Sequence, residues 1–234
     1  MKDGTLYASR VKKAYARHRS SVSQPSIPEP DDPLHRLVVA ILAVGCSDET
    51  AQRAVDRALS NMVDWNEMRV SSARELNRAT GNAIPQGVRQ CQRVLDALQS
   101  IYDHENRLSL NRLKSLGRRE ARHFLESLDG VDEYAAASVL LWSLGGHAVP
   151  VNDRLLEALR KAELVNLDTG RAEVQAFLER NISAAEAKRF CLVMQSFGVG
   201  RARLSGKTGG RKKATRAKKT TKKKTAAKKR KRSR

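Results

Sequence analysis

Residues 118–153 read RREARHFLESLDGVDEYAAASVLLWSLGGHAVPVND, and the rest of the chain is organised around this stretch. Its pattern predicts a polar-faced helix, a tight turn at Gly130, and an apolar helix over residues 135–144 that stops at Gly145 and Gly146. Two helices joined by so short a turn form a helical hairpin. Backbone N–H groups at such a turn lack helical partners, so they suit an anion such as a phosphate. The alternative is an ordinary helical corner that binds nothing.

Residues 128–153 resemble, without a gap, the helix-hairpin-helix and Gly/Pro-Asp segment of the endonuclease III-like DNA glycosylases. Leu128, Gly130 and Val131 fall on the family's Leu-Pro-Gly-Val-Gly turn, and Ala136 falls on the alanine of its second helix. The resemblance implies an all-α fold of the DNA glycosylase kind, with the hairpin over residues 118–146. It also implies a protein of base-excision repair whose partner is double-stranded DNA.

Two positions carry the chemistry of that family, and the resemblance places both of them here. The lysine that forms a Schiff base in members that also cut the strand corresponds to Tyr134, and a phenol cannot form a Schiff base. The catalytic aspartate follows the segment matched by Ala-Val-Pro-Val at residues 148–151, and its position holds Asn152. An amide cannot act as a general base or balance a developing cation. The resemblance therefore implies no lyase activity and weighs against glycosylase activity.

Two alternatives remain open for this segment. Asn152 can simply be the N-cap of the next helix, because asparagine is among the best residues for that position. Asp153 can supply the missing carboxylate if the local backbone is displaced, since it lies about a quarter-turn around the helix. His147, just before this segment, is interpreted as structural, with a phosphate contact as its alternative.

Three further departures from the family concern DNA contacts and cofactors. Asp132 replaces the second turn glycine and brings a carboxylate to the predicted phosphate site, where it opposes anion binding. Gly45 stands where the family has a polar side chain that fills the gap left by a flipped-out base. Many relatives hold an iron–sulfur cluster with four closely spaced cysteines, but Cys191 is alone in that region. We therefore expect no cofactor, with no iron–sulfur cluster and no other metal.

The positive charge of the chain is concentrated at one end. Residues 201–234 hold 18 of the 45 lysines and arginines and none of the 25 acidic residues, so the first 200 residues carry about +2 of the net charge of +20. Such a segment cannot bury enough apolar surface to repay its ordering entropy, so we expect a disordered tail that binds DNA phosphates. Its composition resembles the tails of linker-histone-like proteins. The candidate DNA-binding residues in it are Lys212, Lys213, Lys222, Lys223, Lys224, Lys228, Lys229, Arg230, Lys231 and Arg232.

The remaining sequence predicts three regions. Residues 1–32 contain an amphipathic helix over 5–20 and a proline-rich linker, residues 33–200 form the helical domain, and 201–234 are the tail. Strand signals are weak, so we predict an all-α fold. Additional helices are predicted over residues 35–44, 49–62, 72–78, 87–102, 153–162, 171–180 and 184–197.

The sequence predicts one cellular location and leaves three hypotheses about function. The chain shows no signal peptide and no apolar run of membrane-spanning length. Its three cysteines, Cys46, Cys91 and Cys191, are odd in number, which argues against a disulfide framework. We therefore expect an intracellular monomer of the cytoplasm and nucleoid, or of the nucleus in a eukaryote. The first function is non-catalytic DNA binding on a glycosylase scaffold. The second is an active glycosylase without lyase activity that uses Asp153 or an unrecognised carboxylate. The third is histone-like DNA compaction through the tail.

Overall fold

The computed structural model describes residues 4–21 and 32–205, and all the regular secondary structure in these ranges is helical. The predicted all-α fold class is therefore confirmed. A 3₁₀ helix, η1 (Asn111–Ser115), lies between α6 and α7. The α-helices are α1 (Gly4–Ser21), α2 (Pro33–Leu42), α3 (Asp48–Asn61), α4 (Trp65–Val70), α5 (Ala73–Ala79), α6 (Gly87–Glu105), α7 (Arg118–Ser127), α8 (Glu133–Trp142), α9 (Asp153–Lys161), α10 (Arg171–Asn181) and α11 (Ala184–Ser205).

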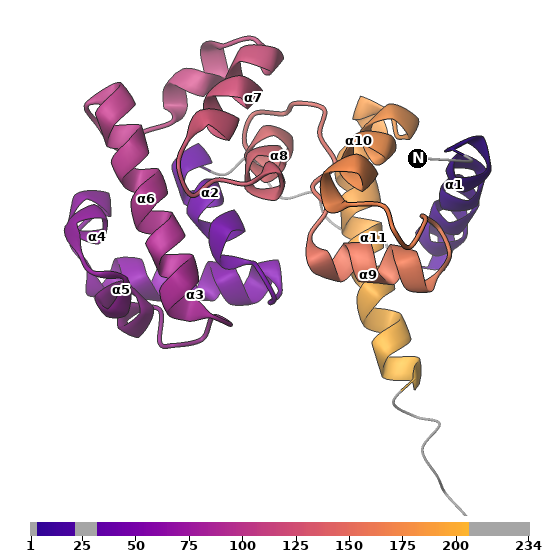
Figure 1. The fold of residues 1–234 in the computed structure, drawn as a ribbon, viewed down its shortest axis with the longest axis horizontal. Helices are drawn as coiled ribbons and strands as arrows, with labels where there is room; N and C mark the ends of the chain where they lie inside the picture. The colour runs from indigo at the N-terminus through magenta and orange to yellow at the C-terminus, as the bar shows by residue number, and fades with distance from the viewer. Residues whose placement is uncertain (1–3, 22–31, 206–234) are drawn as a thin grey trace, which may run out of the picture.

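The helices form two groups that lie side by side (Figure 1). The first group contains α2 to α8, and the second contains α1 together with α9, α10 and α11. Helix α8 joins them, because it packs against α2 and α7 in the first group and against α11 in the second. A helix that packs against neighbours on several sides is apolar on most of its faces, and every residue of α8 except Glu133 is buried.

Helix α2 is the centre of the first group, where it packs against α3, α6 and α8. It begins at Pro33, two residues before the predicted start, because Asp32 and Pro33 together form a strong start signal. The Asp32 carboxylate accepts hydrogen bonds from the backbone N–H groups of Leu34 and His35, at 2.9 and 3.0 Å. Nine of its ten residues are buried, as its largely apolar sequence predicts.

The other predicted helices are all present, and their ends differ from prediction by at most three residues, except at the end of α11. Helix α4 and η1 were not predicted. The start signal for α4 is nevertheless in the sequence, since Asp64 caps the helix through the N–H groups of Asn66 and Glu67. A helix of six residues shows too little periodicity to be detected.

Helix α1 belongs to the helical body rather than to a separate N-terminal region. It packs against α10 and α11, and Val11 and Tyr15 on its inner face are buried. The rings of Tyr15 and Phe190 meet edge to face with 5.3 Å between their centroids. The Tyr15 hydroxyl donates a hydrogen bond to the Glu186 carboxylate.

Helix α11 continues to Ser205, beyond the predicted start of the tail at Arg201. The lysines and arginines predicted to bind DNA through the tail lie outside the described residues. Within residues 4–21 and 32–205, no helix combines the length and apolarity that crossing a bilayer requires.

Candidate functional site

The hairpin predicted over residues 118–146 is formed by α7, a short turn and α8. Gly130 in the turn has φ of +73°, a conformation that L side chains rarely adopt. A Cβ atom at Gly130 would lie 2.2 Å from the backbone carbonyl oxygen of Arg93 on α6. The Arg93 Nε–H group in turn donates a hydrogen bond of 3.1 Å to the Gly130 carbonyl. Glycine is therefore required here for both its conformation and its lack of a side chain.

The predicted turn residues divide between the core and the surface. Leu128 is 3% exposed and packs in the core, and its carbonyl accepts a hydrogen bond from the Val131 N–H at 3.3 Å. Val131 is half-buried. The Leu128 side chain thus packs under the turn in the core, where a ligand cannot contact it.

Asp132 is the N-cap of α8, a role that the sequence analysis did not assign to it. Its Oδ1 atom accepts a hydrogen bond of 2.9 Å from the backbone N–H of Ala135. Its Oδ2 atom lies 3.0 Å from Nη2 of Arg171 and 3.4 Å from Nη2 of Arg93. A carboxylate at a helix N-terminus is favoured by the helix dipole, and here two guanidinium groups stabilise it further.

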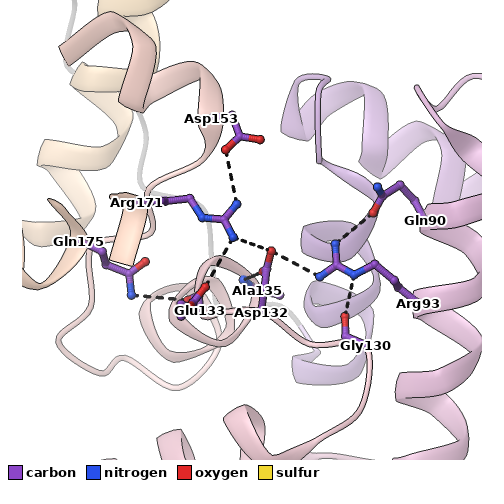
Figure 2. A network of polar contacts seen from close by, with 9 residues as sticks. All are labelled: Gln90, Arg93, Gly130, Asp132, Glu133, Ala135, Asp153, Arg171 and Gln175. Carbon is purple, nitrogen blue, oxygen red and sulfur yellow. Dashed lines mark hydrogen bonds and ion pairs between the residues drawn. The ribbon is translucent and has the colours of Figure 1, made fainter. Parts of the chain in front are cut away.

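Arg171 and Arg93 reach Asp132 from opposite sides, as Figure 2 shows. Arg171 starts α10 in the second group of helices, and Arg93 lies on α6 in the first. Arg171 also lies 3.5 Å from a carboxylate oxygen of Glu133 and 3.5 Å from one of Asp153. The hairpin turn is therefore one place where ion pairs connect the two groups, and the pair between Arg122 on α7 and Glu179 on α10, at 3.0 Å, is another.

Tyr134, at the family's lysine position, is buried and points to a carboxylate on another helix. Its hydroxyl donates a hydrogen bond of 2.9 Å to Oδ1 of Asp48, the first residue of α3. The other oxygen, Oδ2, accepts a hydrogen bond of 2.9 Å from Nη2 of Arg36 on α2. Arg36 also donates from Nε to the hydroxyl of Ser138 at 3.1 Å. These contacts form a chain of polar groups through the middle of the first group of helices.

The pKa of Tyr134 is raised well above that of an ordinary phenol. Burial is the largest cause, and the negative charge of Asp48 adds to it. The charge of Arg36 and a hydrogen bond with the Asn152 side chain act in the opposite direction. Tyr134 is thus a neutral phenol, and Tyr134 and Asn152, the two positions that the resemblance matches to catalytic residues, are neighbours in the structure.

Asn152 and Asp153 both lie at the start of α9, but their side chains have different partners. Asn152 is the N-cap of α9, and its Oδ1 atom accepts a hydrogen bond of 2.8 Å from the backbone N–H of Leu155. Asp153 is exposed, and its carboxylate faces Arg171 (Figure 2). The carboxylate hydrogen-bonded to Tyr134 is that of Asp48.

Gly45, predicted beside a flipped base, ends the turn after α2 and is exposed, with φ of +78°. The neighbouring Cys46 is half-buried, and burial raises the pKa of its thiol, with Asp48 adding to the rise. Cys191 is 2% exposed and lies in the core, as predicted. His147 contacts the backbone carbonyl of Ile182 through Nε2 at 2.9 Å, which agrees with its structural interpretation.

Potential metal ligands do not cluster in the described part of the chain. No group of three or more His, Cys, Asp or Glu side chains there has a geometry that could hold a metal ion. The three cysteines are unpaired thiols.

Sequence reasoning missed four residues of the site: Arg36, Asp48, Arg93 and Arg171. The sequence pattern indicates Asp48 only as a possible cap of the helix over residues 49–62, and it assigns no role to the three arginines. A signal existed for Arg36, because an arginine that directly precedes the apolar run from Leu37 to Leu42 in a buried helix needs a partner. The sequence holds no comparable signal for Arg93 and Arg171, because both lie on helices with many other charges.

Comparison with solved structures identifies the fold. The chain is similar to endonuclease III trapped in a covalent intermediate with DNA, with a TM-score of 0.65 and 16% identity over 81% of this chain and 85% of that chain. It is similar to the 8-oxoguanine glycosylase/lyase of Clostridium acetobutylicum in complex with double-stranded DNA, with a TM-score of 0.65 and 14% identity over 87% of this chain and 71% of that chain.

A third similar structure is the 3-methyladenine DNA glycosylase of H. pylori bound to 1,N6-ethenoadenine, with a TM-score of 0.62 and 15% identity over 83% of this chain and 98% of that chain. No protein-family model and no curated protein matches the sequence. The described helices therefore adopt the helix-hairpin-helix DNA glycosylase fold that the resemblance of residues 128–153 implied.

Proposed function

We propose that this chain, which has the fold of the helix-hairpin-helix DNA glycosylases, is a double-stranded-DNA-binding protein without Schiff-base lyase activity. One observation carries the proposal: the two catalytic positions of the fold hold a buried neutral phenol, Tyr134, and a helix-capping amide, Asn152. Neither group can attack a sugar carbon as an amine does or carry a negative charge near neutral pH.

The contacts of Asp153 support the proposal that it does not take the place of the aspartate to which Asn152 corresponds. The helix-capping bond from Leu155 to Asn152 holds the register of the helix start, so the backbone is not displaced there. In that register Asp153 faces Arg171 and the hairpin turn rather than Tyr134. Asp153 could reach the position of a catalytic aspartate only if α9 lost its N-cap.

The charge distribution supports DNA as the partner and the tail as the main source of affinity. Residues 201–234 carry a charge of +18, whereas the first 200 residues are nearly neutral. Binding through such a segment releases condensed counterions, so the affinity should fall steeply as salt rises and should depend little on base sequence. The glycosylase-like body would then determine which DNA structure is preferred.

A monofunctional DNA glycosylase is the second candidate, because one carboxylate does lie beside the family positions. Asp48 is hydrogen-bonded to Tyr134, which itself interacts with Asn152, and the Asp48 side chain is 24% exposed. It is a better candidate than Asp153 for a group that stabilises a cationic sugar. Its ion pair with Arg36 reduces the negative charge available for that purpose.

Base release from modified duplexes tests the choice between these functions. The protein is incubated with duplexes that contain uracil, an oxidised pyrimidine, 8-oxoguanine or mismatched thymine, and alkali then cleaves any abasic site. The proposal expects duplex binding without base release on each substrate. Release that Asp48→Asn abolishes, and that Asp153→Asn leaves intact, would establish the glycosylase instead. Release abolished only by Asp153→Asn would restore that residue as the catalytic carboxylate.

A truncation that ends at Ser205 separates body from tail, because α11 ends there. If the truncated protein still prefers duplexes with an abasic site or mismatch over intact duplex, the body recognises DNA. If all binding is lost, the tail alone binds DNA, and histone-like compaction becomes the better description.

A further inference from the structure

The Asp132 carboxylate occupies a position that has the donors of an anion-binding site. One oxygen accepts the Ala135 N–H at the start of α8, and the other faces the guanidinium groups of Arg171 and Arg93 at 3.0 and 3.4 Å. These donors come from three different helices and meet at one carboxylate (Figure 2). A backbone N–H at a helix start and two arginines are also what a phosphodiester group needs, because its two free oxygens can accept from both arginines at once.

The acidic side chains at this position outnumber the basic ones. Asp132, Glu133 and Asp153 carry three negative charges, and Arg93 and Arg171 carry two positive charges, so the cluster has a net charge of −1. A cluster with this charge does not attract DNA while Asp132 holds both arginines. Without the Asp132 charge the same cluster would be neutral, and its two guanidinium groups would be available to other anions.

The contacts made by Asp132 can be exchanged for others. The side chains of Asp132, Arg93 and Arg171 are 19%, 23% and 25% exposed, so water and DNA can reach them. Both arginines contact the same oxygen, so neither forms the stronger two-oxygen pairing that a guanidinium group can make. The contacts from Arg171 to Glu133 and Asp153 are long, at 3.5 Å each.

The interior of the cluster is also incompletely hydrogen-bonded. Gln175 is 4% exposed and donates a hydrogen bond of 3.5 Å to the Glu133 carbonyl, but its Oε1 atom has no partner among the described residues. A buried acceptor without a donor is unfavourable. A rearrangement of Arg171 or of the α8 start that supplies a donor to Gln175 would relieve this deficit.

Resting on the proposed DNA-binding function, we propose that Asp132 is an internal competitor of the DNA backbone: it holds Arg93 and Arg171 until a backbone phosphate replaces it. The two arginines are then phosphate-binding residues of the body, and Asp132 keeps their contribution to affinity low.

The test measures duplex binding by the full-length protein over a range of salt concentrations, using fluorescence anisotropy. Asp132→Asn removes the charge and keeps an N-cap, because asparagine caps as well as aspartate. Asp129→Asn is the matched control, because Asp129 is exposed on the same turn and forms no ion pair among the described residues. Each additional phosphate contact steepens the slope of log affinity against log salt concentration by about 0.9. At about 0.2 M salt, this corresponds to a roughly fourfold increase in affinity.

We expect Asp132→Asn to tighten binding by at least about fourfold relative to Asp129→Asn and to steepen the salt slope by about one or two. Adding Arg171→Gln and Arg93→Gln to Asp132→Asn should abolish that gain. Equal effects of Asp132→Asn and Asp129→Asn would overturn the proposal, and so would a gain that persists without the arginines. If Asp132→Asn melts below the assay temperature, Asp132→Ser provides the same comparison, because serine also caps helices without charge.

The wild-type protein separates the two proposals. If it does not bind duplex even at low salt, the proposed function fails. If it binds and only the difference between Asp132→Asn and Asp129→Asn is missing, the competitor role of Asp132 fails alone.

Discussion

The phenol of Tyr134 donates its hydrogen bond to the carboxylate of Asp48, although the two residues are 86 positions apart in the chain. Asp48 is also the partner of Arg36, whose side chain is only 11% exposed. The carboxylate therefore has a structural role whether or not it has a catalytic one. It neutralises Arg36 on helix α2 and accepts the hydrogen bond that orients the phenol of Tyr134.

Asp48→Asn should lower the free energy of unfolding by about 2 to 3 kcal/mol, because it leaves the Arg36 charge largely buried without a counter-charge. Tyr134→Phe should cost about 1 kcal/mol, the usual contribution of one hydrogen bond. Urea denaturation followed by circular dichroism measures both variants and their double mutant. A coupling near zero in this cycle would mean that the two side chains do not interact in solution.

Gly130→Ala should destabilise the protein by about 3 kcal/mol or more, because the new side chain must adopt a positive φ and also clashes with the backbone of α6. The added methyl group would lie 2.2 Å from the Arg93 carbonyl oxygen. Gly145→Ala is the control, because Gly145 has φ of +61° but no atom within 4 Å of its added Cβ, and it should cost about 1 kcal/mol. Equal losses in urea denaturation would show that α6 does not pack against the turn as described.

Cys91 should make stability depend on pH in the alkaline range. Burial raises the pKa of its thiol to about 12, whereas the thiol of the unfolded chain ionises near about 8.5. Its contribution is fully present below the unfolded pKa and is lost as the pH rises toward about 12, because only the unfolded state releases the proton.

Cys91→Ala should therefore reduce the loss of unfolding free energy above about pH 9 by up to about 1.4 kcal/mol per pH unit. Urea denaturation at a series of alkaline pH values gives the slope for each protein. Parallel curves for wild type and variant would show that this thiol ionises equally easily in the folded state. The other buried thiol and tyrosines contribute to both curves, so the difference isolates Cys91.

His147→Ala should lower the unfolding free energy by about 1 kcal/mol and leave duplex affinity unchanged. The reason is that its ring nitrogen lies 2.9 Å from the Ile182 carbonyl, which makes it a link between the segment before α9 and the end of α10. Thermal unfolding and anisotropy on one duplex provide the two readings. Weaker DNA binding without a loss of stability would favour the phosphate contact instead.

The sequence by itself was informative wherever the cause of a structure is local. The turn at Gly130, the apolar helices α2 and α8, and the cap at Asn152 follow from residue types whose preferences act within one helical turn. The resemblance of residues 128–153 gave the fold, because the hairpin and the segment after it are adjacent in sequence. The ends of helices moved by a few residues, since caps such as Asp32 extend a helix beyond its periodic part.

Only the tertiary structure decided which charges meet. Asp48, Arg36 and Tyr134 lie on three helices, and Asp132, Arg93 and Arg171 come from three further places in the chain. Pairing between such side chains depends on how the helices pack, and no periodicity or spacing encodes it. The sequence by itself determined that Tyr134 and Asn152 stand at the two positions that the resemblance matches to a catalytic lysine and aspartate, because that depends on residue identity alone. The packing of the helices decided that the carboxylate of Asp48 meets Tyr134 and that the carboxylate of Asp132 meets Arg93 and Arg171.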